Sequence, residues 1–168
     1  STEKIDLYTT LDLYANTTKP LVILLANDKT IHSVYDLIVR LNSNLENKPS
    51  ILTYVNPVTP LIINDSTVQK MVRSIQIGCP VVYSNYSMSG ATTPASAIGT
   101  LSLLNAELLA GLVLGQIIKE GASMIMGSLP ASFDMVTMGS VFSMDTFLNN
   151  LPGQTLNCSA TADIMVGL

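Results

Sequence analysis

The sequence predicts an α/β fold in which parallel strands alternate with helices. Apolar runs begin at Leu21, Ile51 and Val81, so each start lies 30 residues after the previous one (51 − 21 and 81 − 51). That is the period of a strand–helix unit with short loops. A fourth apolar run begins near Ala122. Because a barrel needs about eight strands, we expect one domain, residues 1–168, that forms half of a (β/α)8 TIM-type barrel or a small open sheet.

The first half of the chain is expected to hold an opening helix and two strand–helix units. Helical spacing of apolar residues indicates the helices, and continuous apolar runs indicate buried parallel strands. Thr30 can cap the second helix, Asp65 or Ser66 can cap the third, and Gly78 closes the third. The expected elements are helix 5–15, strand 21–26, helix 30–41, strand 51–55 and helix 66–77.

A complete strand–loop–helix–strand unit is expected between Pro80 and Gly127. Residues 81–83 are β-branched or aromatic and suit a strand, whereas the small polar residues 84–90 are typical of a loop. Residues 122–126 form the next apolar strand. The loop lies at the carboxyl end of a strand, where parallel α/β folds bind their ligands.

The helix of this unit is expected to run from Pro94 to Lys119, capped by Thr92 or Thr93 and stopped by a left-handed Gly121. Residues 95–118 are long enough to cross a bilayer, but polar residues interrupt them and no basic flank follows. We therefore expect no membrane span. Small residues should let this helix pack closely on the sheet; they are Ala106, Ala110 and Gly111.

The sequence signals weaken after Ser128. Residues 129–140 are expected to be a loop or short turns, followed by helices from Met144 and over 154–166. The chain stops where a further strand is expected, so we expect the natural polypeptide to continue beyond Leu168.

Composition excludes several classes of function. The formal net charge is −4 and the eight Lys and Arg residues are scattered, which argues against a nucleic-acid partner. Cys79 and Cys158 lie far apart without a C-x-x-C pair, so we expect two buried thiols in a reducing cytoplasm, with a disulfide as the alternative. The chain opens with an amphipathic pattern and not with the apolar core of a signal peptide. A cytoplasmic location follows from these features.

No familiar catalytic cluster is present. His32 is the sole histidine, so neither a zinc ligand set nor a Ser–His–Asp triad is indicated, and no phosphate-binding loop occurs. We assign no metal site and no catalytic residue. Glu107 lies in an apolar helix, where a buried carboxylate must be paired or protonated. It can orient a loop, act as an acid, or accept hydrogen bonds from backbone at a barrel end.

One motif carries a family resemblance. Met88-Ser89-Gly90-Ala91-Thr92-Thr93-Pro94 is followed by Asn105-Ala106-Glu107 and by Gly127-Ser128. From about Ile77 to Phe142 the chain resembles the trimethylamine methyltransferase (MttB-like) superfamily. The resemblance implies a (β/α)8 barrel, of which this chain is an internal fragment. It also implies transfer of a methyl group from trimethylamine, or a quaternary amine such as a betaine, to the cobalt of a corrinoid protein.

The same resemblance implies the cofactor and the partners. No cofactor is expected to bind this chain directly, because the corrinoid belongs to a cognate partner protein. The other ligand is a small methylated amine. Some members use pyrrolysine for catalysis, and none occurs in these 168 positions. Two open strand edges, at Leu21 and Ala122, lead us to expect a homo-oligomer.

Residues at the strand ends are the candidates for substrate binding. A methylated ammonium is held mainly by cation–π contacts at ~0.5–2 kcal/mol per ring, which draws attention to aromatic residues, Tyr54 among them. Asparagine and serine can position polar groups, although core packing and ordinary turns explain the same residues. The predicted site is Asn56, Tyr83, Asn85, Tyr86, Met88, Ser89, Ser128 and Phe133. The alternative function is a non-catalytic α/β binding or structural domain.

Overall fold

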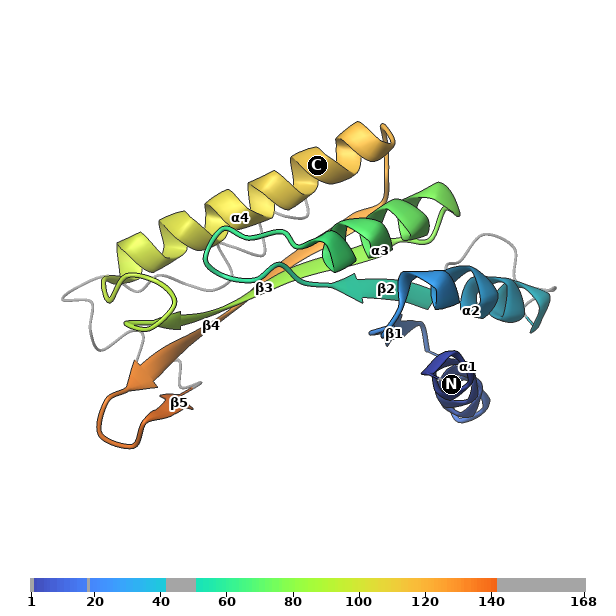
Figure 1. The fold of residues 1–168 in the computed structure, drawn as a ribbon, viewed down its shortest axis with the longest axis horizontal. Coiled ribbons are helices and arrows are strands. Elements are labelled where there is room, and N and C mark those ends of the chain that lie inside the picture. Colours follow the sequence, from blue (N-terminus) through green and yellow to red (C-terminus); the bar gives the residue numbers. More distant parts are fainter. Residues whose placement is uncertain (1, 18, 42–50, 142–168) are drawn as a thin grey trace.

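The computed structural model describes residues 2–17, 19–41 and 51–141 (Figure 1). The helices expected from Met144 and over 154–166, and Cys158, lie outside the described residues. The elements are α1 (Thr2–Ala15), β1 (Leu21–Ile23), α2 (Asp28–Leu41), β2 (Ile51–Val55), α3 (Asp65–Gln76), β3 (Val81–Ser89), α4 (Ala97–Ile118), β4 (Met124–Asp134) and β5 (Gly139–Val141).

The sheet has the order β1-β2-β3-β4-β5. Strands β1 to β4 are parallel neighbours in chain order, which confirms the predicted half barrel. Strand β5 was not predicted. It pairs antiparallel with the end of β4, where Ser132 lies opposite Val141. The fourth parallel strand is therefore not the last strand of this sheet.

The helices form a layer on one face of the sheet. Helix α1 packs on α2, α2 on α3, and α3 on α4, as Figure 1 shows. Between this layer and the sheet lie two apolar clusters. One contains Ile23, Ile31, Val34, Ile38 and Ile51, and the other contains Val55, Met71, Ile75, Val81, Tyr83 and Leu108.

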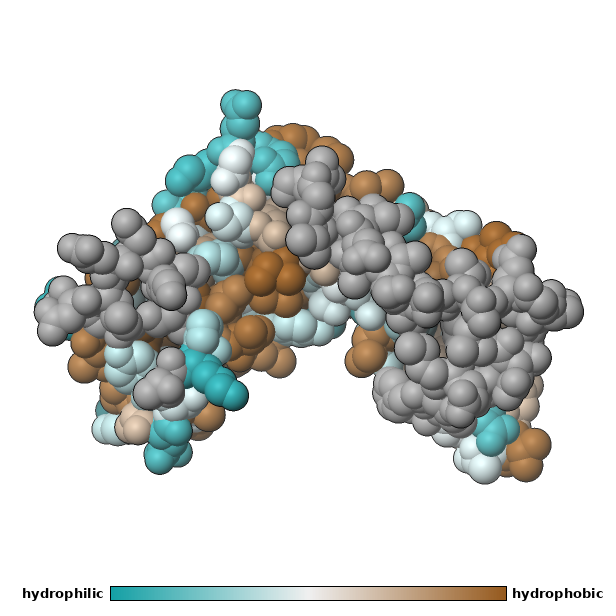
Figure 2. All heavy atoms as spheres, turned by 180° about the vertical axis from the view of Figure 1, so that it is seen from behind, coloured by the Kyte–Doolittle hydropathy of each residue, from teal (hydrophilic) through white to brown (hydrophobic). Residues whose placement is uncertain are grey.

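The opposite face of the sheet carries apolar side chains that no described helix covers. Val22, Ile125 and Leu129 are 55%, 53% and 53% exposed. Seen from behind, the molecule is arched, and apolar residues lie beside the notch that opens on its lower side (Figure 2). In a closed barrel this face is the interior, so we call it the inner face. The helix layer then corresponds to the outside of the barrel.

Two predicted loops are wrong, because β3 and β4 are longer than expected. Residues 84–90 are mostly strand, and β4 continues from Gly127 to Asp134 instead of ending in a loop over 129–140. The two strands pair without a break from Val81↔Met124 to Ser89↔Ser132. This parallel pairing satisfies the backbone groups of small polar residues, which is why tertiary contacts override their turn preference.

Helix α4 begins later than predicted. Its N-cap is Ser96, whose side chain accepts a hydrogen bond from the N–H of Gly99, so neither Thr92 nor Thr93 caps it. Similarly, Asn64 caps α3 in place of Asp65 or Ser66. Caps lie one to four residues from the predicted positions because several neighbouring residues have equal capping ability.

The packing of α4 also differs from the prediction. Gly111 and Gly115 are buried against the sheet, but Ala106 and Ala110 are exposed. A Cβ on Gly115 would lie 2.1 Å from Sδ of Met124, so the glycines permit the close approach. Among the described residues α4 is the one helix long and apolar enough to cross a membrane. Its glycine side packs on β3 and β4 instead.

Candidate functional site

The motif after Tyr86 folds into a compact turn that connects β3 to α4. The carbonyl oxygen of Met88 accepts hydrogen bonds from the N–H groups of Ala91, Thr92 and Thr93. Gly90 has a φ of 87°, a left-handed conformation that favours glycine. The Ser89 hydroxyl donates to the carbonyl oxygen of Pro94 at 3.2 Å. The polar groups of Met88 and Ser89 are thus used within the turn.

Behind β3, the carboxylate of Glu107 is the centre of a buried hydrogen-bond network. Glu107 is 3% exposed. Its Oε1 accepts from the N–H of Leu61, and its Oε2 accepts from Thr59 Oγ1 at 2.9 Å and from Asn85 Nδ2 at 2.8 Å. Asn85 also donates to the carbonyl oxygen of Leu104 at 3.0 Å. Of the three interpretations of Glu107, the one in which it binds backbone at the barrel end is confirmed.

Tyr83 packs on the helix side of β3 next to this network. Its side chain is 0% exposed, and an added Cβ on Gly111 would lie 2.3 Å from its ring. Burial, together with the nearby charge of Glu107, raises the pKa of Tyr83 to about 12. Tyr83 and Tyr86 are three positions apart on one strand, so they face opposite sides. The two tyrosines of the predicted site therefore do not contribute to one common cage.

Replacing Tyr83 with phenylalanine should leave the free energy of unfolding unchanged or raise it by ~1 kcal/mol. The Tyr83 hydroxyl is buried without a hydrogen-bond partner, so the substitution removes a polar group that gains nothing from the fold. Because the folded pKa is about 12 and the unfolded value is 10.0, the wild type should lose stability as the pH rises from 10 to 12. Tyr83→Phe should lack that loss. Denaturant titrations at neutral and alkaline pH measure both effects, and a large loss at neutral pH would contradict this account.

Three predicted residues lie on the inner face, toward the carboxyl ends of the strands. Tyr86 pairs with Leu129 and Met88 pairs with Ala131, so each pair shares a side of the sheet. Phe133 lies two residues beyond Ala131 and continues the same alternation on β4. Tyr86 is 36% exposed. The ring of Tyr86 is therefore accessible from the interior of the predicted barrel.

The other predicted residues are distributed differently. Asn56 is exposed directly after β2, and its carbonyl oxygen accepts from Thr67 Oγ1 at 2.8 Å. Asn85 and Ser128 are paired neighbours within β3 and β4, on the side that faces α4. The sequence predicted that Asn85 and Ser128 come directly after strands, whereas both lie inside them. The structure thus separates Tyr83, Asn85 and Ser128 from the inner-face residues.

The sequence did not indicate Thr59 or Leu61, the loop residues that bind Glu107. A carboxylate in an apolar helix was a signal that buried donors exist. No local pattern identifies which loop supplies these donors, because Leu61 and Thr59 lie 46 and 48 residues before Glu107 in the sequence.

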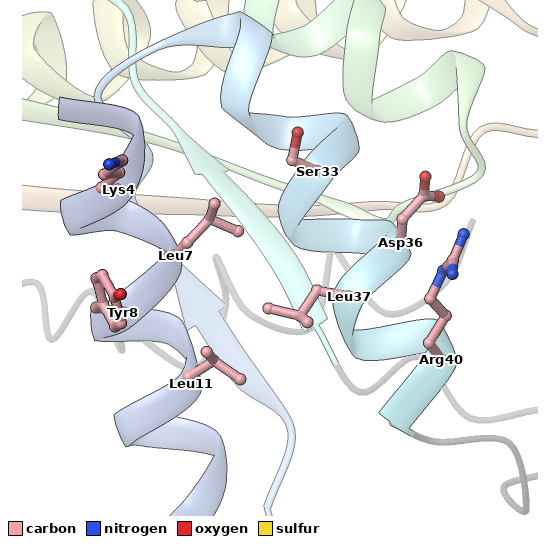
Figure 3. A pocket seen from close by; sticks show the side chains of 8 residues that line it. All are labelled: Lys4, Leu7, Tyr8, Leu11, Ser33, Asp36, Leu37 and Arg40. Atoms are coloured by element: carbon pink, nitrogen blue, oxygen red, sulfur yellow. The ribbon is translucent and has the colours of Figure 1, made fainter. Parts of the chain in front are cut away.

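Metal-ligand geometry and the main groove of the described residues do not point to the predicted site. Within residues 2–17, 19–41 and 51–141, no three His, Cys, Asp or Glu side chains gather to hold a metal ion. A groove of about 480 Å³ lies between α1 and α2, where Leu7 and Leu11 point toward Leu37 (Figure 3). Its lining includes none of the predicted site residues. Three predicted residues, Tyr86, Met88 and Phe133, share the inner face of the sheet, so we take this face as the candidate site.

Comparisons with known proteins identify the family. The trimethylamine methyltransferase (MTTB) family matches residues 1–146. Glycine betaine methyltransferase of Desulfitobacterium hafniense (strain Y51) is 38% identical over 91 residues, which cover 54% of this chain and 19% of that protein. Trimethylamine methyltransferase MttB of Methanosarcina thermophila is 33% identical over 88 residues, 52% of this chain and 18% of that protein.

These matches cover about a fifth of each relative's length, so the chain corresponds to part of such a protein. A second protein named trimethylamine methyltransferase MttB, from Desulfitobacterium hafniense (strain DSM 10664 / DCB-2), is 32% identical over 94 residues, 56% of this chain and 19% of the relative. The family match extends over most of the chain and includes all four parallel strands. The chain therefore belongs to the trimethylamine methyltransferase family.

Proposed function

We propose that this chain is part of a methyltransferase that takes a methyl group from trimethylamine or a related quaternary amine such as a betaine. The acceptor is the cobalt of a corrinoid carried by a cognate partner protein. The observation that carries the proposal is the family match over residues 1–146, with relatives named for trimethylamine and for glycine betaine. We further propose that the protein acts in the cytoplasm as a homo-oligomer.

The inner face supplies what a methylated ammonium needs. Such a cation donates few or no hydrogen bonds, so aromatic faces and apolar contacts hold it. Tyr86 and Phe133 offer rings near the strand ends, and Met88 offers a polarizable thioether. Tyr54 pairs with Val82 and thus also lies on the inner face. Asn56, at the end of β2, can orient the polar end of a betaine.

The proposed reaction is a direct displacement. The methyl carbon leaves nitrogen, which keeps the electron pair of the broken C–N bond, and bonds to low-valent cobalt of the partner's corrinoid. The residues of this chain have two tasks: they hold the ammonium in line for attack, and they exclude water from the cavity.

The complete protein that contains this chain provides the test. It is mixed with reduced corrinoid protein and either trimethylamine or glycine betaine, and cobalt methylation is followed by its visible absorbance. Calorimetric titration with each amine measures binding independently. Methylation with one amine supports the proposal. Absence of both binding heat and methylation, for both amines, would favour the non-catalytic α/β domain.

Changing Tyr86 to alanine in the complete protein should lower kcat/KM for the amine by about 2- to 30-fold, the equivalent of ~0.5–2 kcal/mol for one ring. The melting temperature should change little, because Tyr86 is partly exposed. Tyr86→Phe is the matched control, since it keeps the ring face and should retain most of the activity. A sharp fall in melting temperature with intact turnover would show that the ring only packs the fold.

A further inference from the structure

The loop between β2 and α3, residues 56–64, is hydrogen-bonded to α3 at its two ends and to α4 at its midpoint. Two of its donors, the Thr59 hydroxyl and the Leu61 N–H, bind the carboxylate of Glu107 on α4. Within the loop, Val58 and Ile62 exchange backbone hydrogen bonds of 2.7 and 3.0 Å. The loop is thus a small closed unit whose midpoint is tied to α4.

Leu61 shows why this tie matters. Its φ is 57°, a left-handed conformation that is uncommon for a residue other than glycine. The hydrogen bond from its N–H to Oε1 of Glu107 offsets the cost of that conformation. Without the carboxylate, this hydrogen bond is lost and an ordinary backbone conformation at Leu61 becomes more favourable. The loop would then change shape.

The network requires hydrogen-bond acceptors at the side-chain end of Glu107. Thr59, Leu61 and Asn85 all present donors to Glu107, and none of the described salt bridges involves it. A glutamine amide in the same place would put an N–H₂ donor where one carboxylate oxygen now accepts hydrogen bonds, so donor would face donor. The loop therefore depends on the two acceptor oxygens of Glu107 as well as on the shape of its side chain.

From this geometry we infer that Glu107 is a positioning residue for the amine site, acting through the 56–64 loop. The loop begins at Asn56, directly after β2, at the carboxyl edge of the sheet. The Asn56 carbonyl oxygen is held by Thr67 Oγ1 of α3, and anchoring the loop midpoint to α4 adds a second constraint on Asn56 relative to Tyr86 on β3. This inference rests on the proposed amine site, but the anchoring itself does not.

The anchoring is tested by hydrogen exchange of the complete protein. In Glu107→Gln, the Leu61 amide should exchange at least about tenfold faster, as expected when a charge-assisted hydrogen bond is lost. Thr59→Val removes a single donor, and Thr59→Ser keeps the hydroxyl as its conservative partner. Amides in the middle of β3 should be unchanged. If Leu61 exchanges at the wild-type rate in Glu107→Gln, the anchor does not exist and the inference is overturned.

The positioning role is tested by kinetics with the same variants. Glu107→Gln and Thr59→Val should raise KM for the amine by about tenfold with a smaller change in kcat, the pattern of lost ground-state positioning. Thr59→Ser should restore the wild-type KM. Faster exchange at Leu61 with unchanged KM in both variants would overturn the positioning role. If the wild type transfers no methyl group, the proposed function fails, and amine titration of the same variants by calorimetry still decides whether the loop shapes a binding site.

Discussion

Replacing Asn85 with aspartate is expected to lower the free energy of unfolding by about 3–5 kcal/mol at neutral pH, the range for an uncompensated buried charge. The change in volume is minimal, but a carboxylate oxygen takes the place of an amide donor. The Nδ2 atom of Asn85 lies 2.8 Å from Oε2 of Glu107 and 3.0 Å from the carbonyl oxygen of Leu104. The variant would direct a negative charge at two acceptors.

The loss in Asn85→Asp should grow as the pH rises. Two carboxylates in contact cannot both ionise freely, so the pKa of one rises above its usual ~4. The folded variant then binds more protons than the unfolded chain, which means that its stability relative to wild type falls as the pH rises above about 4. Denaturant titrations of the complete protein across this range measure the slope.

Asn105→Asp is the matched control for this prediction. Asn105 lies on the exposed side of α4, the helix that carries Glu107, and the substitution makes the same change of side chain there. It should change the free energy of unfolding by less than ~0.5 kcal/mol. Equal losses at Asn85 and Asn105 would show that the contact with Glu107 is not the cause.

An alanine in place of Gly111 is expected to destabilise the protein by about 1–3 kcal/mol through overpacking. In an exposed helix the same change would stabilise by about 1 kcal/mol, so the sign itself is informative. The new Cβ would lie 2.3 Å from Cε1 and 2.4 Å from Cζ of Tyr83. Tyr83 is fully buried, so α4 and β3 would have to separate. Thermal and denaturant unfolding of the complete protein measure the effect.

Gly115→Ala provides the comparison on the same helix. Its Cβ would meet Sδ of Met124 at 2.1 Å, but a methionine side chain can rotate away at small cost. The loss at Gly115 should therefore be smaller than the loss at Gly111. Combining Gly111→Ala with Tyr83→Leu should cost less than the sum of the single changes, because the smaller side chain relieves the clash. Strict additivity would rule out the contact with Tyr83 as the cause.

The sequence identified several residues of the candidate site, but it did not show which face of the sheet each residue occupies. Tyr86 was identified because an aromatic side chain near a strand end suits a methylated ammonium. Tyr83 met the same criterion, and Asn85 was chosen as a residue that can position polar groups, but both lie on the opposite face. The distinction depends on strand alternation, and residues 84–90 had been taken for a loop, in which no alternation applies.

The sequence by itself determined the order of elements and the parallel direction of four strands. Apolar runs of strand length, each followed by a stretch with helical spacing, have few ways to bury their apolar surface, and a parallel sheet under a helix layer is the chief one. Only the tertiary structure decided how far β3 and β4 extend and what Glu107 binds. Those outcomes depend on contacts such as Glu107 with Leu61, which are distant in sequence and leave no local pattern. Pairing between strands and the desolvation of a buried carboxylate act only once the chain is folded.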